Sequence, residues 1–134
     1  MPILKIIKSR LHYEHKNITI AGAKLDAIVS DSFIKRMIGL MYADAMPKTS
    51  CMLFVSRFSS TESIWMKGML FSIDIIWLDK DKRIVAIEEN VPPCKRRFFC
   101  KTYNPHLPFR FVIELSAGFI QENGITKSSK LEFE

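Results

Sequence analysis

The sequence predicts an α+β fold, a compact and mostly antiparallel β-sheet or partly open barrel with two short helices. Short apolar or alternating runs of strand length recur along the chain, and turn-forming residues separate them. Helical periodicity is confined to two short segments. With 134 residues and apolar side chains throughout, the chain is predicted to form a single domain over residues 1–134.

The first elements are two strands and a helix. Residues 18–20 and 25–29 alternate as two strands or as one bulged strand, with Gly22 as the break. A helix is expected to begin near Ser32, because Ser and Asp residues that can cap it stand there. Its apolar residues recur at i, i+4, i+7 and i+8, which predicts one apolar face made of Phe33, Met37, Leu40 and Met41.

The rest of the chain predicts more sheet. Residues 52–55 read as a buried strand, and residues 73–78 as a central strand, because they are apolar on both faces apart from Asp74. Residues 84–87 complete a hairpin with the central strand. Four prolines predict a surface loop over residues 91–109. The last predicted elements are a strand at 111–115, a short helix that Ser116 caps and that runs to about Asn123, and a closing strand at 131–133.

The net charge and the cysteine count narrow the class of partner and the cellular compartment. The net charge is +6, and part of the excess lies in a basic N-terminal arm, residues 1–16, and in residues 95–101. Such a field favours acidic partners. The N-terminal residues lack the apolar core of a signal peptide, and no stretch approaches the ~20 apolar residues of a membrane span. Three cysteines favour reduced thiols, so we expect a cytoplasmic protein.

Trp65, Met66 and Lys67 are the residues most suggestive of a site. In a row they offer a large apolar surface, a soft gap-filler and a cation, which predicts the wall of a pocket. The alternative is that Trp65 and Met66 simply fill core. Asp74, if buried, must be paired, hydrogen-bonded or protonated. The candidates are an ion pair with Arg36 or Lys67, a bond to backbone groups, or an acid with a perturbed pKa.

Glu114 and Gly39 also lead to structural predictions. Glu114 shares a strand face with Arg110 and Val112, which predicts a solvated surface pair. Gly39 lies on the helical pattern at a cost of about 1 kcal/mol relative to alanine. It predicts either close packing, with Trp65 over the helix, or the end of the helix.

The cysteines and the basic loop give weaker signals. Cys94, Cys100 and His106 are candidate zinc ligands, but their spacing is wider than in common zinc modules, and no metal or cofactor is predicted. Unpaired thiols are the default expectation for Cys94 and Cys100, with a disulfide as an alternative in an oxidising compartment. Residues 95–101 combine cations with rings, as single-stranded nucleic acid sites do. A solvated loop with two anchoring phenylalanines is favoured over that interpretation.

The ordered set of motifs resembles a known family, the small domains called domain of unknown function 192. The resemblance covers about residues 25–127 and rests on Arg36-x-x-Gly39-Leu40-Met41, Met52-Leu53-Phe54, Trp65-Met66-Lys67, Asp74, Pro92-Pro93 and Val112-Ile113-Glu114-Leu115-x-Ala117-Gly118. It implies a compact, β-rich fold and supplies no agreed activity. The chain departs from the family pattern at Gly68-Met69, where the family usually has Asn-Thr, so two polar groups are missing beside Lys67.

We therefore expect a ligand-binding or interaction module without catalysis of its own. Its site would be formed by Arg36, Trp65, Met66, Lys67 and Asp74, and would hold a small anionic ligand. An enzyme is the first alternative, with Asp74 as general acid or base and Lys67 stabilising negative charge. A nucleic-acid-binding module that uses the loop at 95–101 and the N-terminal arm is the second. The sequence identifies neither the ligand nor the oligomeric state.

Overall fold

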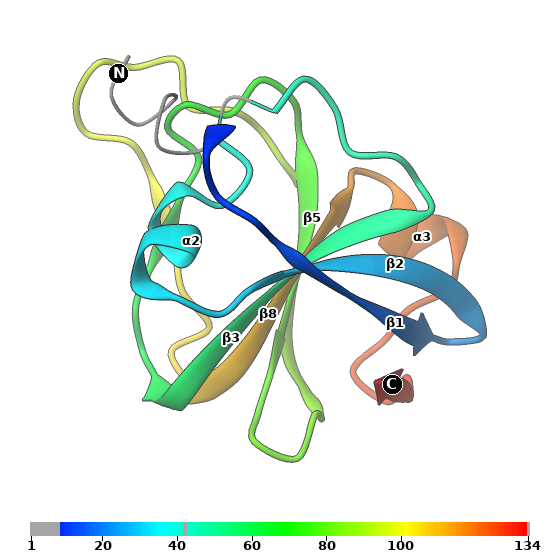
Figure 1. Ribbon diagram of the computed structural model, residues 1–134. Helices are drawn as coiled ribbons and strands as arrows, with labels where there is room; N and C mark the ends of the chain where they lie inside the picture. Colours follow the sequence, from blue (N-terminus) through cyan, green and yellow to red (C-terminus); the bar gives the residue numbers. More distant parts are fainter. Residues whose placement is uncertain (1–8, 42, 134) are drawn as a thin grey trace.

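A curled mixed sheet forms the body of the protein in the computed structural model, which describes residues 9–41 and 43–133 (Figure 1). The basic arm expected at residues 1–16 lies partly outside these residues. In sheet order the strands are β6 (Ile84–Val91), β5 (Ile73–Leu78), β8 (Phe109–Ser116), β3 (Ser50–Ser60), β2 (Ala23–Ser30), β1 (Glu14–Ile20) and β9 (Leu131–Phe133). A second, two-stranded sheet pairs β4 (Ile64–Trp65) with β7 (Thr102–Tyr103), and the helices are α2 (Phe33–Ile38) and α3 (Phe119–Glu122).

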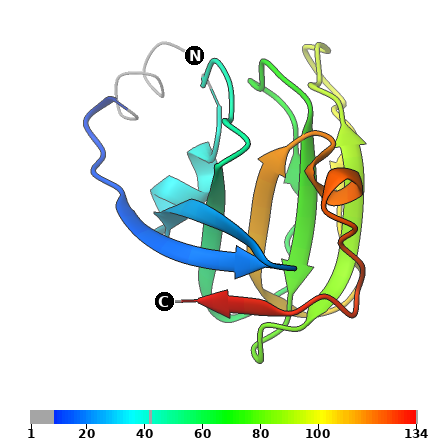
Figure 2. The same ribbon diagram turned by 90° about the vertical axis from the view of Figure 1, so that its right-hand side faces the viewer.

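The pairing of β2 with β3 is parallel, whereas the other neighbouring strands of the large sheet pair antiparallel. A parallel pair requires a crossover connection. Residues 31–49 supply it and carry α2, which lies beside β3 in Figure 1. Figure 2 shows the sheet curling so that β1, β2 and β9 lie across from β5 and β6. The expected β-rich, partly open barrel is confirmed, and the described residues include two short helices.

Two apolar clusters lie on opposite faces of the strands. Successive residues of β5 alternate between them: Ile76 and Leu78 pack in the first cluster, and Ile75 and Trp77 in the second. All six residues of β5 are buried, as expected for a strand covered on both faces. α3 closes the first cluster with Phe119 and Ile120. No helix within residues 9–41 and 43–133 is long and apolar enough to cross a membrane.

The first helix is shorter than the sequence predicts. Ser32 caps it by accepting a bond from the amide of Lys35, and it ends at Ile38, because Gly39 adopts φ 51° and ψ −129°. The predicted four-residue apolar face is therefore wrong. Phe33 and Met37 are 73% and 47% exposed, whereas Leu40 is buried beyond the helix end. Gly39 ends the helix and also allows close packing, but by the ring of Phe54 rather than by Trp65.

Other boundaries differ in informative ways. The first alternating segment is two strands, β1 and β2, joined by a turn in which Ala21 and Gly22 both have positive φ. The strand expected at 52–55 extends over Ser50–Ser60. Ser116 belongs to β8 and does not cap the second helix. Gly118 takes that position, with φ 93° and no side-chain cap.

Candidate functional site

A cavity of about 330 Å³ lies between the α2 crossover and the strands β3, β4 and β8. Apolar side chains make up most of its wall, with contributions from each of these elements: Phe33, Met37, Leu40, Phe54, Ile64, Trp65, Met69, Phe109 and Val112. Three of them are large and substantially exposed: Phe33, Met37 and Trp65. Exposed apolar groups around a concave, mainly apolar site are what a ligand-binding cavity offers.

Glu114 is the buried polar group of this cavity. It lies on β8 between Met52 of β3 and Ile75 of β5, and is only 5% exposed. The predicted surface pair is therefore wrong, and Arg110 instead donates from Nε to the carbonyl of Ser56. Burial raises the pKa of Glu114 to about 8, so the carboxyl is largely neutral at pH 7. Among the residues that the structure describes, no hydrogen bond or ion pair engages this carboxyl.

Arg36 brings a cation to the same cavity. Its Nη1 donates to the carbonyl oxygen of Val55 at 2.9 Å, which attaches α2 to β3. A guanidinium has five N–H donors, and this bond uses one of them. The side chain also lines the cavity together with Trp65 and Glu114. The cavity thus combines an apolar wall with the cation of Arg36, the buried and largely neutral carboxyl of Glu114, and the exposed acidic side chain of Glu62 at its edge.

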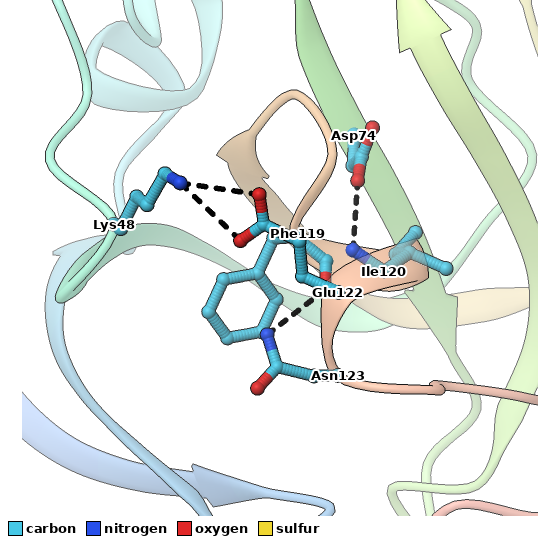
Figure 3. Close-up of polar contacts among 6 residues, drawn as sticks. All are labelled: Lys48, Asp74, Phe119, Ile120, Glu122 and Asn123. Carbon is cyan, nitrogen blue, oxygen red and sulfur yellow. Dashed lines mark hydrogen bonds and ion pairs between the residues drawn. The ribbon is translucent and has the colours of Figure 1, made fainter.

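Asp74 is fully buried and serves the backbone. Its Oδ1 accepts from the amide of Asn90, and its Oδ2 from the amide of Ile120 at the start of α3, both at 2.9 Å. Figure 3 shows the second bond. Of the interpretations left open by the sequence, bonding to backbone groups is therefore the one found. An ion pair with Arg36 or Lys67 is not formed within the described residues, and Asp74 does not line the cavity.

Strand alternation explains why Asp74 and the cavity are apart. In the β5–β8 register Asp74 lies opposite Leu115, whereas Ile75 lies opposite Glu114. Residues directly opposite share a face, so Asp74 is on the side covered by α3 and Glu114 is on the other side. The amide of Asn90 reaches Asp74 because the β5–β6 register shifts between Ile73 and Ile75, and a bulge leaves an amide without a ladder partner.

Met66 and Lys67 support the wall rather than line it. Met66 is 1% exposed and belongs to the second cluster. Lys67 places its Nζ 5.5 Å from the ring centroid of Trp65 and donates to the carbonyl oxygen of Arg97 at 3.1 Å. It therefore links a wall residue of the cavity to the loop at 95–101. The adjacent Gly68 has φ 78°, and an added Cβ would lie 2.8 Å from Cε of Met41.

The cysteines form a disulfide rather than unpaired thiols. Cys94 and Cys100 are bonded, with their Cα atoms 5.8 Å apart, so the default expectation for them is wrong. Cys51 is free and buried in the first cluster, where burial raises its pKa to about 12. Among the described residues no three His, Cys, Asp or Glu side chains gather as a metal site, His106 included.

The phenylalanines of the basic loop are not anchors. Phe98 and Phe99 are 64% and 89% exposed, so neither ring packs into the body of the protein.

Glu114 is the residue that the sequence interpretation missed. It interrupts the apolar run at 111–115 in the same way that Asp74 interrupts 73–78, and this shared signal marks both as candidate buried carboxyls.

The family model of domain of unknown function 192, described as an uncharacterised ACR family, matches residues 16–133. Among curated relatives, an uncharacterised UPF0127 protein of Pyrococcus horikoshii is 30% identical over 122 residues, covering 90% of each chain. One from Thermococcus gammatolerans is 33% identical over 93 residues, covering 69% of this chain and 56% of the relative. The chain thus spans little more than half the length of that second protein.

Two solved structures share the fold. A candidate transcription regulator from Sinorhizobium meliloti has a TM-score of 0.84 at 24% identity, covering 92% of this chain and 97% of that one. A protein of unknown function from Novosphingobium aromaticivorans has a TM-score of 0.79 at 21% identity, covering 92% and 87%. At these identities the likeness concerns the fold alone. The family match and the Pyrococcus relative establish that the chain belongs to the family of domain of unknown function 192.

Proposed function

We propose that the protein is a ligand-binding domain whose cavity takes a small apolar molecule carrying a carboxylate. The observation that carries this proposal is Glu114, a buried carboxyl on the wall of a cavity of about 330 Å³ with no hydrogen-bond partner among the described residues. A buried polar group without a partner is costly, and proteins of stable fold contain few of them. A bound molecule that bonds to Glu114 would remove this cost.

The chemistry of the wall selects the class of ligand. A protonated Glu114 can donate one O–H bond, and Arg36 supplies N–H donors with a positive charge. Both groups therefore suit an oxygen anion. The apolar residues around them suit a hydrocarbon body, with Trp65 as a large contact surface. We place Arg36, Glu114 and Trp65 in contact with the ligand and assign Lys67 the positioning of Trp65.

The experiment follows binding through Trp65. The chain has two tryptophans, and Trp77 is 1% exposed, so a Trp77→Phe background isolates the signal of Trp65. Benzoate, 2-naphthoate and decanoate are titrated and compared with the alcohols of the same carbon skeletons. We expect saturable quenching by the carboxylates and affinities for the alcohols that are about tenfold weaker, the size of one charge-assisted bond.

The pH dependence separates this site from adventitious apolar binding. Above its pKa of about 8, Glu114 loses its proton and would repel a carboxylate. The affinity is then expected to fall about tenfold per pH unit above that value, by proton linkage. Glu114→Gln, which stays neutral, should give a flat profile. Equal binding of alcohols and carboxylates, or an unchanged profile in the Gln variant, would refute the proposal.

Matched variants test the named contacts. Arg36→Gln is paired with Arg57→Gln, because Arg57 is exposed on β3 and does not line the cavity. Trp65→Ala is paired with Leu70→Ala, since Leu70 is 61% exposed and also lies outside the lining. For the second pair, binding is followed by isothermal titration calorimetry. The first member of each pair should lose affinity, and the second should retain it.

A further inference from the structure

A short loop closed by the Cys94–Cys100 disulfide concentrates charge and exposed rings. It carries Lys95, Arg96 and Arg97, with Lys101 directly after it, and residues 92–108 include no acid. These four basic residues are exposed. Phe98 and Phe99 stand among them, 64% and 89% exposed. Exposed aromatic pairs inside a cationic segment are unusual on a protein surface and mark interaction sites.

The loop is fixed to the body of the protein at its base. The amide of Cys94 donates to the carbonyl of Met66 at 3.1 Å, and Lys67 Nζ donates to the carbonyl of Arg97. The disulfide joins the two ends of the loop. Phe99 has φ 62°, an uncommon conformation for a non-glycine residue. Its ring is thus presented outward by a covalently closed loop rather than by a free chain.

We propose that this loop docks the protein on an anionic lipid bilayer, with Phe98 and Phe99 inserted into the interface and the basic residues at the headgroups. Phenylalanine side chains can bury at the boundary between headgroups and hydrocarbon, and each nearby cation is attracted by the negative surface. The loop lies at the top of both views, and the β5–β6 turn lies at the bottom (Figures 1 and 2). This end of the molecule can therefore meet a flat surface while the β5–β6 turn faces away from it.

The disulfide favours a lipid surface over a nucleic acid. Disulfides persist in oxidising compartments and are rare where nucleic acids are abundant. Proteins that bind single strands also stack bases along a basic groove, whereas these rings stand on a small closed loop. The disulfide also argues against the reduced, cytoplasmic location expected from the sequence. Binding to single-stranded DNA remains one measurable outcome of the test.

Vesicle binding tests the proposal directly. Wild-type protein is sedimented with vesicles of equal parts phosphatidylglycerol and phosphatidylcholine, and with pure phosphatidylcholine. We expect binding to the anionic vesicles alone. Lys95→Ser/Arg96→Ser/Arg97→Ser should weaken it by roughly a hundredfold, since each cation near an anionic surface contributes about a fivefold factor. Phe98→Ser/Phe99→Ser should weaken it about tenfold or more through lost apolar burial.

A charge-matched variant serves as the control. Lys80→Ser/Lys127→Ser/Lys130→Ser removes the same charge from exposed positions near the β5–β6 turn, where residues 127–130 adjoin residues 82–84. It should bind almost as the wild type does. Circular dichroism melting confirms that each variant is folded. If the control and the loop variants lose equal vesicle affinity, the effect is due to net charge alone and the loop is not the membrane-docking site.

An insertion probe separates docking from simple electrostatic attraction. Phe98→Trp is placed in a Trp65→Phe/Trp77→Phe background, so that emission reports the loop alone. Anionic vesicles should shift its emission to the blue, and lipids brominated near the headgroup should quench it. An unshifted spectrum in the presence of sedimenting vesicles would refute insertion. Tight binding to oligo(dT) without vesicle binding would assign the loop to nucleic acid instead.

Discussion

Two buried carboxyl groups lie on neighbouring strands and have opposite environments. Asp74 of β5 is fully buried, and each of its oxygens accepts a backbone amide bond. Glu114 of β8 is 5% exposed, has no such bond from the described residues, and has its pKa raised to about 8 by burial. The two carboxyl residues are offset by one position in the β5–β8 pairing, since Asp74 lies opposite Leu115 and Ile75 lies opposite Glu114.

The difference separates architecture from candidate function. Asp74 accepts hydrogen bonds from two backbone amides that regular secondary structure leaves without an acceptor. One amide lies at the β-bulge at Asn90, and the other lies in the first turn of α3. Glu114 forms no hydrogen bond or ion pair with the described residues, and it lies on the wall of a cavity. A buried polar group that stabilises the fold is satisfied by the fold itself, whereas one that serves a ligand keeps its bonding capacity for that ligand.

Removing Asp74 should produce the largest loss of stability. Asp74→Leu leaves two buried amides without acceptors, and we expect a loss of about 3–5 kcal/mol, measured by urea unfolding. Asp79→Leu is the matched control. Asp79 also accepts two backbone bonds, from Asp81 and Arg83, but in an exposed turn, so about 1 kcal/mol is expected. Equal losses would mean that burial does not distinguish the two sites.

The second prediction concerns the pH dependence of stability through Glu114. Its folded-state pKa of about 8 lies above the ordinary value of 4.5, so the folded protein holds a proton that the unfolded chain has lost between these values. Stability is therefore full below about pH 4.5 and falls by about 1.4 kcal/mol per pH unit as pH rises toward 8, which gives about 2–3 kcal/mol between pH 5 and pH 7. Glu114→Gln should remove this fall. A wild type and a Gln variant with parallel profiles from pH 5 to 8 would contradict the raised pKa.

A third prediction tests the wall around Glu114. Gly39→Ala forces a β-carbon to 3.1 Å from the ring of Phe54 in a backbone conformation that favours glycine. We expect a loss of about 1–2 kcal/mol, together with weaker carboxylate binding because the wall shifts. Gly22→Ala, where φ is also positive but nothing lies within 4 Å, should cost less and leave binding intact. Thermal melts and titrations of both variants measure the contrast.

The smallest expected effect concerns a second contact to α3. Lys48 pairs with Glu122 at 3.1 Å in a solvated position (Figure 3). Exposed pairs of this kind contribute little, so Lys48→Ala should change stability by less than about 0.5 kcal/mol. A larger loss would show that the ion pair, as well as Asp74, holds α3 on the sheet. Urea midpoints for Lys48→Ala and Asp74→Asn, compared side by side, decide this.

Periodicity and turn residues predicted most of the strands and the β-rich class, because alternation follows directly from the pleat. They did not predict the face on which Asp74 lies. All residues of β5 are buried, so its pattern carries no contrast between the two sides. The helix face was wrong because a glycine in mid-pattern ends the helix, and Phe33 and Met37 then line a cavity instead of filling core. Arg36 and Trp65, two of the residues predicted for the site, line one cavity, whereas the position of Glu114 required the strand register.

The bond from Lys67 to Arg97 has a thermodynamic consequence. Lys67 places its Nζ over the ring of Trp65, a wall residue of the cavity, and donates to the carbonyl of Arg97 in the loop. A molecule that displaces Trp65 acts on Lys67 and so on the seating of the loop. If loop and cavity each bind as proposed, their binding free energies are coupled, and coupling between two sites is reciprocal. Vesicles would then change the affinity for carboxylates by the same factor by which carboxylates change the affinity for vesicles. Lys67→Met should remove this coupling, so that neither ligand changes the affinity for the other.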